Sequence, residues 1–287
     1  MGSMGMISET GFGWLTPVLS YLMACVGGAL GLRATLRAVR ALDPRSRRNW
    51  LIAAAVAIGT GIWTMHFIAM LGFTVVGTQV RYDVPLTLAS LLVAIVVVGA
   101  GVFLVARGGG RPQALLAGGL ATGLGVATMH YIGMSAVHID GEIHYAPWEV
   151  GASLVIAAVA ATAALWASLT IHNPLATLGA SLVMGVAVSA MHYTGMAAVR
   201  VQVNPGGPPP SGATAMDFIF PLTVGLGSYL FLTAAYVGLS DSGRPGQTAT
   251  GIPAPAERAA RRTPVDAPAP GRPAASAHRP LVEGSGH

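Results

Sequence analysis

Charged side chains are scarce in this sequence. They make up 9% of its 287 residues, whereas hydrophobic residues make up 53%. Ordinary soluble domains carry about 25% charged residues, so this composition excludes a soluble globular protein. It predicts an integral membrane protein that crosses the lipid bilayer several times.

Cysteine is nearly absent, and lysine is absent altogether. The single cysteine, Cys25, lies inside a hydrophobic run. One cysteine excludes an intramolecular disulfide and a cysteine zinc cluster, so we interpret Cys25 as a small buried apolar residue. All 16 basic residues are arginines, and their positions carry information about orientation in the membrane.

Seven hydrophobic runs are long enough to cross about 30 Å of hydrocarbon as helices. Prolines stand at or just before several of the expected starts, where a helix tolerates them. The sequence therefore predicts an all-α, polytopic membrane helix bundle with seven transmembrane helices. The predicted spans cover residues 14–34, 50–72, 85–106, 113–137, 148–170, 175–199 and 217–239.

The arginines predict the direction of these spans. Six follow the first span, two follow the third and six follow the seventh, whereas the opposite loops hold only Arg81 and Arg200. By the positive-inside rule, the N-terminus (1–13) is outside the cell and the C-terminus is cytoplasmic. This orientation accounts for most of the net charge of +5. We therefore expect the lipid bilayer as a partner and no nucleic acid.

The composition of the chain changes sharply after the seventh span. Residues 14–239 form the predicted membrane domain, whereas residues 240–287 are rich in proline, alanine and arginine and lack hydrophobic periodicity. Such a composition predicts a disordered cytoplasmic tail. The many alanines and glycines favour a bacterial origin, which places the chain in the inner membrane as a multi-pass protein.

A repeat of two spans recurs three times. Each even-numbered span carries one histidine, at spacings of 64 and 62 residues, with methionine directly before it, methionine four residues after it and glycine seven residues before it. Internal similarity at a fixed period indicates a repeated structural unit. The repeated residues are Gly59, Met65, His66 and Met70, then Gly123, Met129, His130 and Met134, then Gly185, Met191, His192 and Met196.

The repeat predicts one shared site. On a helix, positions i and i+4 lie on one face, so each span presents an imidazole and a thioether together. Small residues three positions after each histidine (Ala69, Gly133 and Gly195), with the glycines seven positions before, allow neighbouring helices to approach closely. All three spans run outwards, which places the histidines at a common depth of about 10 Å below the outer surface at 1.5 Å per residue.

Imidazole and thioether are soft or borderline ligands that suit copper, especially Cu(I). The three even-numbered spans contain no aspartate or glutamate, which favours an ion of low charge in lipid. The predicted metal ligands are His66, His130 and His192 with Met70, Met134 and Met196. Met65, Met129 and Met191 point about 100° from the histidine face on an ideal helix, so they either line the site or pack in the core.

Other interpretations of the repeat remain open. A buried histidine can serve a structural role, methionine stripes often fill cores, and two histidines on facing helices can hold haem b. Tyr131 and Tyr193 follow their histidines directly and are candidate residues around the cofactor. Phe67 occupies that position in the first copy, so a phenol is not required in every repeat.

Five further histidines lie outside the repeat. The outer loop holds His138 and His144 with Asp140 and Glu142, which could capture a metal or simply form a polar loop with a turn at Asp140 and Gly141. We interpret His172 as a solvated loop residue. His278 and His287 lie in the predicted tail and indicate no function.

The repeated motif Met-His-(Tyr/Phe)-x-(Gly/Ala)-Met, placed in each even-numbered span, resembles the MHYT domain of bacterial membrane sensors over about residues 10–240. The resemblance implies a sensor that binds copper near the outer face through the Met, His and Tyr positions and perceives oxygen, carbon monoxide or nitric oxide. Phe67 and Ala69 depart from the family's pattern. The family often joins this module to cyclic di-GMP or kinase domains, and because none occurs in these residues we expect a separate cytoplasmic partner.

The leading hypothesis is a non-enzymatic sensor. The sequence offers no nucleophile with an adjacent base, no carboxylate pair inside the spans and no glycine-rich phosphate loop. Two alternatives are a copper transport or insertion protein and a haem-binding membrane electron carrier.

Overall fold

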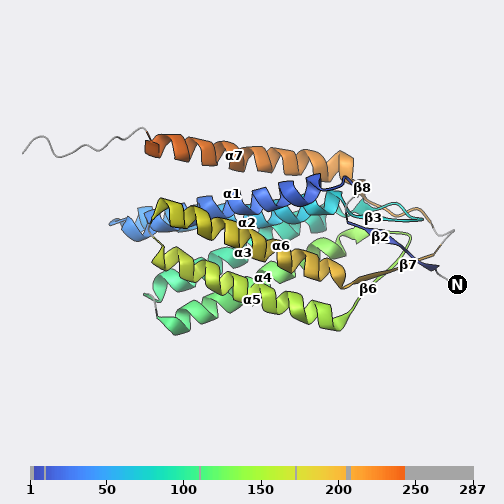
Figure 1. The fold of residues 1–287 in the computed structure, drawn as a ribbon, viewed down its shortest axis with the longest axis horizontal. Helices are drawn as coiled ribbons and strands as arrows, with labels where there is room; N and C mark the ends of the chain where they lie inside the picture. The colour runs from blue at the N-terminus through green and yellow to red at the C-terminus, as the bar shows by residue number, and fades with distance from the viewer. Residues whose placement is uncertain (1–2, 10, 110, 172, 205–207, 243–287) are drawn as a thin grey trace, which may run out of the picture. The chain divides into compact units, whose positions relative to one another are not determined.

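Seven long helices dominate the computed structural model, which describes residues 3–9, 11–109, 111–171, 173–204 and 208–242 (Figure 1). All seven are long and apolar enough to span a membrane, so the prediction of a seven-helix membrane bundle is confirmed. The helices are α1 (Leu15–Arg40), α2 (Pro44–Leu71), α3 (Val84–Arg107), α4 (Pro112–Ser135), α5 (Pro147–Thr170), α6 (Pro174–Ala197) and α7 (Phe220–Ser242), with a π-helical turn, η1 (Ala215–Ile219), before α7.

Side-chain caps and prolines set the helix starts. The Asp43 carboxylate accepts a hydrogen bond from the Ser46 backbone at the start of α2, and Asp83 caps α3 in the same way. Each cap satisfies an amide that has no partner within the helix. The cap moves the start of α2 to Pro44, six residues before the predicted span. The arginines that follow the first predicted span therefore lie in the last turns of α1 and the first turns of α2.

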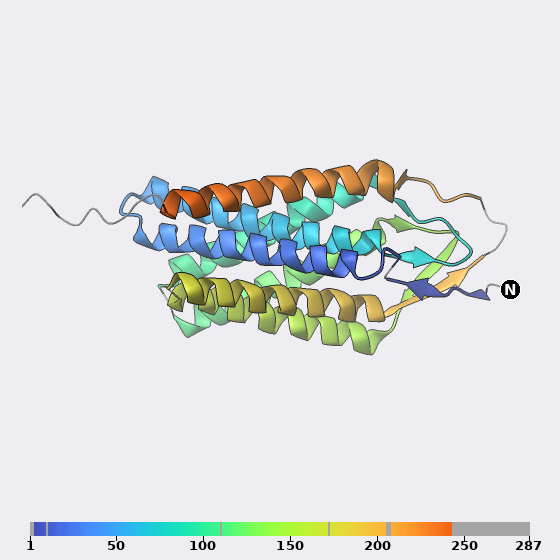
Figure 2. The ribbon, with the colours of Figure 1, turned by 45° about the horizontal axis from the view of Figure 1, so that its top comes forward.

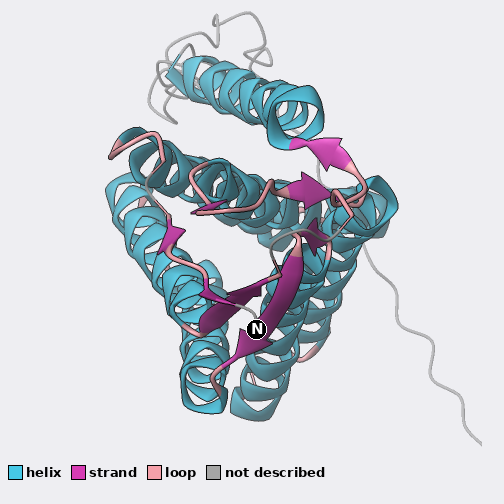
Figure 3. Ribbon diagram, turned by 90° about the vertical axis from the view of Figure 1, so that its right-hand side faces the viewer, coloured by secondary structure: helices cyan, strands magenta, loops and turns pink. Residues whose placement is uncertain are grey.

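Helices α1 to α6 form a closed ring. Each helix packs beside the next one in the sequence, α6 packs back against α1, and α7 lies outside the ring (Figure 3). Glycine permits the closest of these approaches. At the contact between α1 and α2, a Cβ atom added to Gly27 would lie 2.7 Å from the Cα atom of Gly61. A larger side chain at either position would force the two helices apart.

The glycines seven residues before each histidine hold the even helices against their neighbours. A Cβ atom added to Gly59 would lie 2.8 Å from the Cα atom of Ile95 on α3, and one on Gly123 would lie 2.5 Å from that of Ala158 on α5. Gly185 faces α1, where an added Cβ atom would meet a side chain, 2.5 Å from Sγ of Cys25. The close helix approach that the repeat predicts is confirmed at these positions, and it gives the ring an approximate threefold symmetry.

Eight short strands lie at the end of the ring opposite the arginine-rich end (Figure 2). They pair antiparallel in the orders β1-β7-β6, β2-β3 and β5-β4-β8. The expectation of an all-α chain did not include them. Six of the eight have only two residues, too few to show an alternation, whereas the alternation in residues 199–203, VRVQV, was missed. The strands are β1 (Ser3–Met4), β2 (Ile7–Ser8), β3 (Thr74–Val75), β4 (Arg81–Tyr82), β5 (Val137–His138), β6 (Gly141–Tyr145), β7 (Val199–Val203) and β8 (Ala213–Thr214).

Each even helix leads almost directly into a strand of this cap: α2 into β3, α4 into β5 and α6 into β7. The cap is also tied to the helix ends by side chains. The hydroxyl of Tyr82, a buried residue of β4, donates a hydrogen bond of 3.2 Å to the backbone oxygen of Met70 in the last turn of α2. The strands therefore fix the helix ends that carry the repeated motif.

The bundle presents apolar side chains outwards, as a membrane protein must. Leu92 and Val96 of α3 and Val155 and Val159 of α5 are all about 60% exposed, whereas Cys25 is buried as predicted. Exposed aliphatic faces on apolar helices contact lipid, so the chain is a multi-pass protein of the inner membrane. The predicted tail lies outside the described residues from 243 onwards, as does His172.

Candidate metal centre

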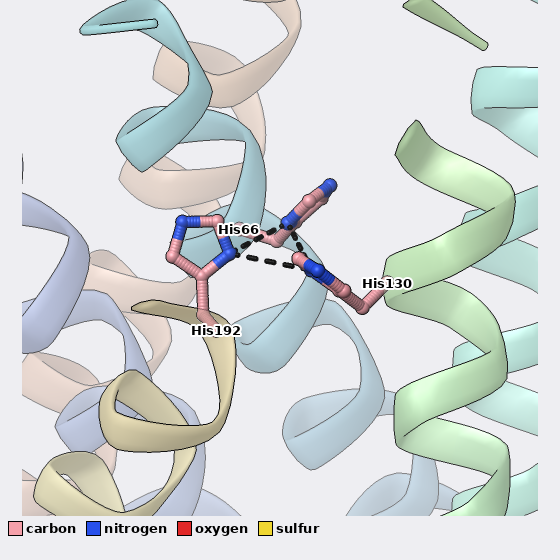
Figure 4. Close-up of side chains that lie close together, drawn as sticks. All are labelled: His66, His130 and His192. Carbon is pink, nitrogen blue, oxygen red and sulfur yellow. Dashed lines mark hydrogen bonds between the residues drawn. The ribbon is translucent and has the colours of Figure 1, made fainter. Parts of the chain in front are cut away.

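Three imidazole rings from three different helices meet inside the ring of helices (Figure 4). The Nδ1 atom of His66 lies 3.0 Å from Nδ1 of His192 and 3.2 Å from Nδ1 of His130, and the third edge of the triangle measures 3.4 Å. All three side chains are at most 2% exposed. The structure thus brings together the three histidines that the sequence places at one level.

The rings pack edge to face. Their centroids lie 4.9, 5.0 and 5.2 Å apart, an arrangement that needs space on the neighbouring helix. A Cβ atom on Gly133 would lie 2.6 Å from Nε2 of His66, and one on Gly195 would lie 2.5 Å from Nε2 of His130. In the second and third repeats, the glycine three residues after the histidine therefore accommodates the imidazole of the preceding repeat.

The nitrogens of this cluster cannot all satisfy one another. A neutral imidazole has one N–H donor and one lone pair. If all three protons are on Nε2, three Nδ1 lone pairs face each other. If one Nδ1 carries the proton instead, it donates a hydrogen bond to one neighbour at a time. Nε2 of His66 and Nε2 of His130 are buried without a hydrogen-bond partner among the described residues. A cation between the Nδ1 atoms would remove the repulsion.

The size of the triangle fits a metal ion. A point equidistant from three nitrogens with these separations lies about 1.9 Å from each, close to the 2.0–2.1 Å of a zinc–imidazole bond. Small movements of the rings, or an ion slightly out of the nitrogen plane, give normal bond lengths. Among the described residues, no carboxylate or thiol belongs to the cluster, so the donor set is neutral.

The six methionines of the motif are all buried, at 3% exposure or less. Met191 also lines an apolar cavity on the side of the histidines that faces the arginine-rich end, and Met134 lines a groove at the strand end. The distances that define the cluster join histidine nitrogens only. Met65, Met70, Met129, Met134, Met191 and Met196 therefore remain predicted ligands.

The two tyrosines of the motif contact neighbouring helices. The Tyr131 hydroxyl forms a 2.8 Å hydrogen bond with the Ser153 hydroxyl of α5, and its ring lies 5.7 Å from that of Tyr145. Burial raises the pKa of Tyr145, and the neighbouring Tyr131 raises it further. Among the described residues, the buried Tyr193 hydroxyl has no partner of hydrogen-bond geometry, although Ser20 of α1 is near it.

The serines that face the motif were missed by the sequence analysis. In the first copy, where Phe67 has no hydroxyl, the indole N–H of Trp63 instead donates a 2.9 Å hydrogen bond to the Ser90 hydroxyl of α3. Ser90 and Ser153 are fully buried and occupy matching places in the similar segments LASLLVA and GASLVIA. This second repeat, in the odd-numbered helices, is the signal that could have revealed them.

The histidines of the outer loop are not part of the centre. Nδ1 of His138 donates a 3.0 Å hydrogen bond to the backbone oxygen of Ser211, and His144 lies 3.3 Å from the Glu142 carboxylate on the exposed face of β6. Within the described part of the chain, the four polar residues of this loop form no group that could hold a metal.

The model of one protein family matches the chain three times. The match is to MHYT, described as a bacterial signalling protein N-terminal repeat, over residues 59–118, 123–181 and 185–244. Each matched segment begins at the glycine seven residues before a histidine, so the family's repeat and the repeat in this sequence coincide.

Several curated proteins are similar to this chain. The bifunctional diguanylate cyclase/cyclic di-GMP phosphodiesterase MucR of Pseudomonas aeruginosa is 42% identical over 161 residues, which cover 54% of this chain and 23% of MucR. The cyclic di-GMP phosphodiesterase NbdA of the same organism is 35% identical, over 66% of this chain and 25% of NbdA. The signaling protein YkoW of Bacillus subtilis is 31% identical, over 72% of this chain and 26% of YkoW.

The chain thus spans about a quarter of the length of the curated relatives it matches. No solved structure matches it.

Proposed function

The chain belongs to the MHYT family of bacterial signalling proteins, and from that premise we propose that it is a membrane sensor domain without catalytic activity of its own that binds one copper ion. His66, His130 and His192 are the ligands, each through Nδ1. The observation that carries the proposal is the Nδ1 triangle with edges of 3.0, 3.2 and 3.4 Å in a fully buried site.

Charge and ligand softness support copper over other metals. Mg²⁺ and Ca²⁺ require oxygen ligands, and this cluster offers nitrogen only. A divalent ion would bring two positive charges into a buried site without a carboxylate, which is costly at membrane depth. Cu(I) carries one charge and suits imidazole and thioether donors. The six buried methionines offer such thioethers on the same helices.

The same distances argue against haem. Two histidines that bind haem iron from opposite faces hold their nitrogens about 4 Å apart, twice a metal–nitrogen bond of about 2 Å. All three separations here are shorter, and the rings pack edge to face with no slot for a porphyrin between them. A copper ion therefore fits the donor set better than haem b.

A signal requires a small ligand or an electron to reach the site. Copper held by three nitrogens has an open coordination position that oxygen, carbon monoxide or nitric oxide can occupy. The cavity below the histidines is lined mainly by aliphatic residues such as Ile62, Val126 and Val188, and apolar cavities favour small apolar molecules. Exposure of the site to a gas or a redox change would shift α2, α4 and α6, which carry the histidines, relative to one another.

The relatives indicate the output of such a signal. MucR and NbdA are named for enzymes of cyclic di-GMP turnover, and this chain corresponds to about a quarter of each. We therefore propose that the sensor controls a cytoplasmic cyclic di-GMP enzyme. Coupling requires that the ligand bind two conformations with different affinity, and the ring of helices supplies the contacts that would change.

Copper transport is the second candidate and has less support. Transport requires successive ligands across the bilayer, and the cavity between the histidines and the arginine-rich end is lined by aliphatic side chains, with Met184 and Met191 as its sulfur-containing residues. Copper uptake by vesicles separates the two functions, because a sensor binds the ion without moving it across the membrane.

Elemental analysis of the purified protein tests the proposal. We expect about one copper per chain in the wild type, close to none after replacement of all three histidines by alanine, and unchanged copper in the control His144→Ala, whose side chain is exposed. A Soret band in the visible spectrum, or copper retained by the triple variant, would refute the three-histidine copper centre.

A further inference from the structure

A groove at the strand end of the bundle reaches one of the motif methionines. Its walls come from the end of α4, from β5 and β6, and from residues 208–211, and they include His138, Tyr145 and Pro209. Met134 lines the same groove although its side chain is only 1% exposed. The groove therefore reaches a buried motif methionine, which lies one helical turn from His130.

His138 has the hydrogen bonding of a metal-binding histidine. Its Nδ1 donates to the backbone oxygen of Ser211 at 3.0 Å, so the neutral ring has its lone pair on Nε2. Histidines that bind metals usually donate their other N–H to a backbone carbonyl or a carboxylate, which fixes the tautomer and the ring orientation. His138 is partly exposed and lines the groove, so an ion that enters the groove from the solvent meets this residue.

The other two repeats lack this feature. The residue eight positions after the histidine lies in the strand that follows each even helix, and it is Thr74 in the first copy and Arg200 in the third. A threonine is a poor ligand for a soft ion, and a protonated arginine side chain has no lone pair to offer a metal. Arg200 also donates hydrogen bonds to backbone oxygens and to Glu149. Only the second repeat places a further soft ligand in the strand that follows the helix.

We propose that this groove is the loading port of the metal centre, through which a soft monovalent cation passes from His138 to Met134 and on to His130. The proposal rests on the proposed function, because it supplies the same three-histidine site. At each step one metal–ligand bond forms as another breaks, the charge of the ion stays +1, and no oxidant or reductant is needed. Intermediate ligands lower the cost of moving an ion from water into a dry site.

The chain offers a matched control for this route. His144 lies on the neighbouring strand β6, is more exposed than His138, and pairs with Glu142 at 3.3 Å. It does not line the groove. If any surface histidine near the strand end were enough to collect metal, His144 and His138 would contribute alike.

Loading kinetics test the port. Metal-free full-length protein in detergent is mixed in a stopped-flow instrument with Cu(I) held by a chromogenic chelator, and the loss of the chelator's colour gives both the loading rate and the final stoichiometry. We expect His138→Ala and His138→Gln to load about 10-fold more slowly than the wild type, with the same final stoichiometry. His138→Met supplies a thioether and should load at nearly the wild-type rate, as should His144→Ala.

The outcomes separate the port from the site. Wild-type loading rates in both His138→Ala and His138→Gln would overturn the port and leave the three-histidine centre intact. A wild-type protein that takes up no Cu(I) at equilibrium would overturn the proposed function and the port with it. Equal slowing by His138→Ala and His144→Ala would also overturn the port, because it would show general electrostatic capture at the strand end.

Discussion

Gly133→Ala should weaken metal binding through a single methyl group. The added carbon would lie 2.6 Å from Nε2 of His66, whereas an ordinary contact begins at 3.4 Å. The imidazole must therefore move by about 0.8 Å, roughly four times the 0.2 Å tolerance of a metal–ligand bond. His66 provides the 3.0 and 3.2 Å edges of the nitrogen triangle, so the change removes one of three ligands.

Loss or distortion of one ligand should lower the affinity for Cu(I) by about 10-fold to 100-fold. Competition with a chelator of known affinity measures this change, and X-ray absorption spectroscopy counts the nitrogen ligands. Gly195→Ala should have a similar effect, because its methyl group would lie 2.5 Å from Nε2 of His130.

Two controls separate this effect from a general loss of stability. Gly179→Ala on α6 and Gly225→Ala on α7 introduce the same methyl group where nothing lies within 4 Å, so they should bind Cu(I) like the wild type and melt at the same temperature or higher. Wild-type affinity and three nitrogen ligands in both Gly133→Ala and Gly195→Ala would refute the histidine geometry.

Three further predictions concern the surroundings of the site. Ser153→Ala should leave the Tyr131 hydroxyl unpaired and lower the free energy of unfolding by about 1–3 kcal/mol, without a loss of copper. Adding Tyr131→Phe to this variant should recover part of the lost stability in thermal melts, and no recovery would contradict the pairing. Burial raises the pKa of Glu9 above its ordinary 4.5, so folding favours the protonated form and stability should fall as the pH rises through the folded pKa. Glu9→Gln should flatten that part of the curve of melting temperature against pH, and an unchanged curve would exclude Glu9 as its cause. Gly123→Leu should separate α4 from α5, where even a Cβ atom would lie 2.5 Å from the Cα atom of Ala158, and it should lower stability by about 1–3 kcal/mol or more in chemical denaturation; stability equal to the wild type would show that the two helices can move apart freely.

The amino-acid sequence by itself determined the membrane architecture and the residues of the motif. In hydrocarbon, each backbone amide and carbonyl must find its partner within its own helix, so the seven spans follow from local composition alone. The repeat then singled out His66, His130 and His192, because three copies of one pattern at nearly equal spacing place their histidines at one level. These inferences need no knowledge of which helix lies beside which.

The tertiary structure alone decided how those residues meet. The closed ring of six helices, the Nδ1 triangle, the pairing of Tyr131 with Ser153 and the strands over the helix ends join residues far apart in the chain. A periodic pattern shows which face of a helix is special, but the partner of that face depends on how all the helices pack. The sequence could therefore name the three histidines, and only the packing could turn one nitrogen of each towards the other two.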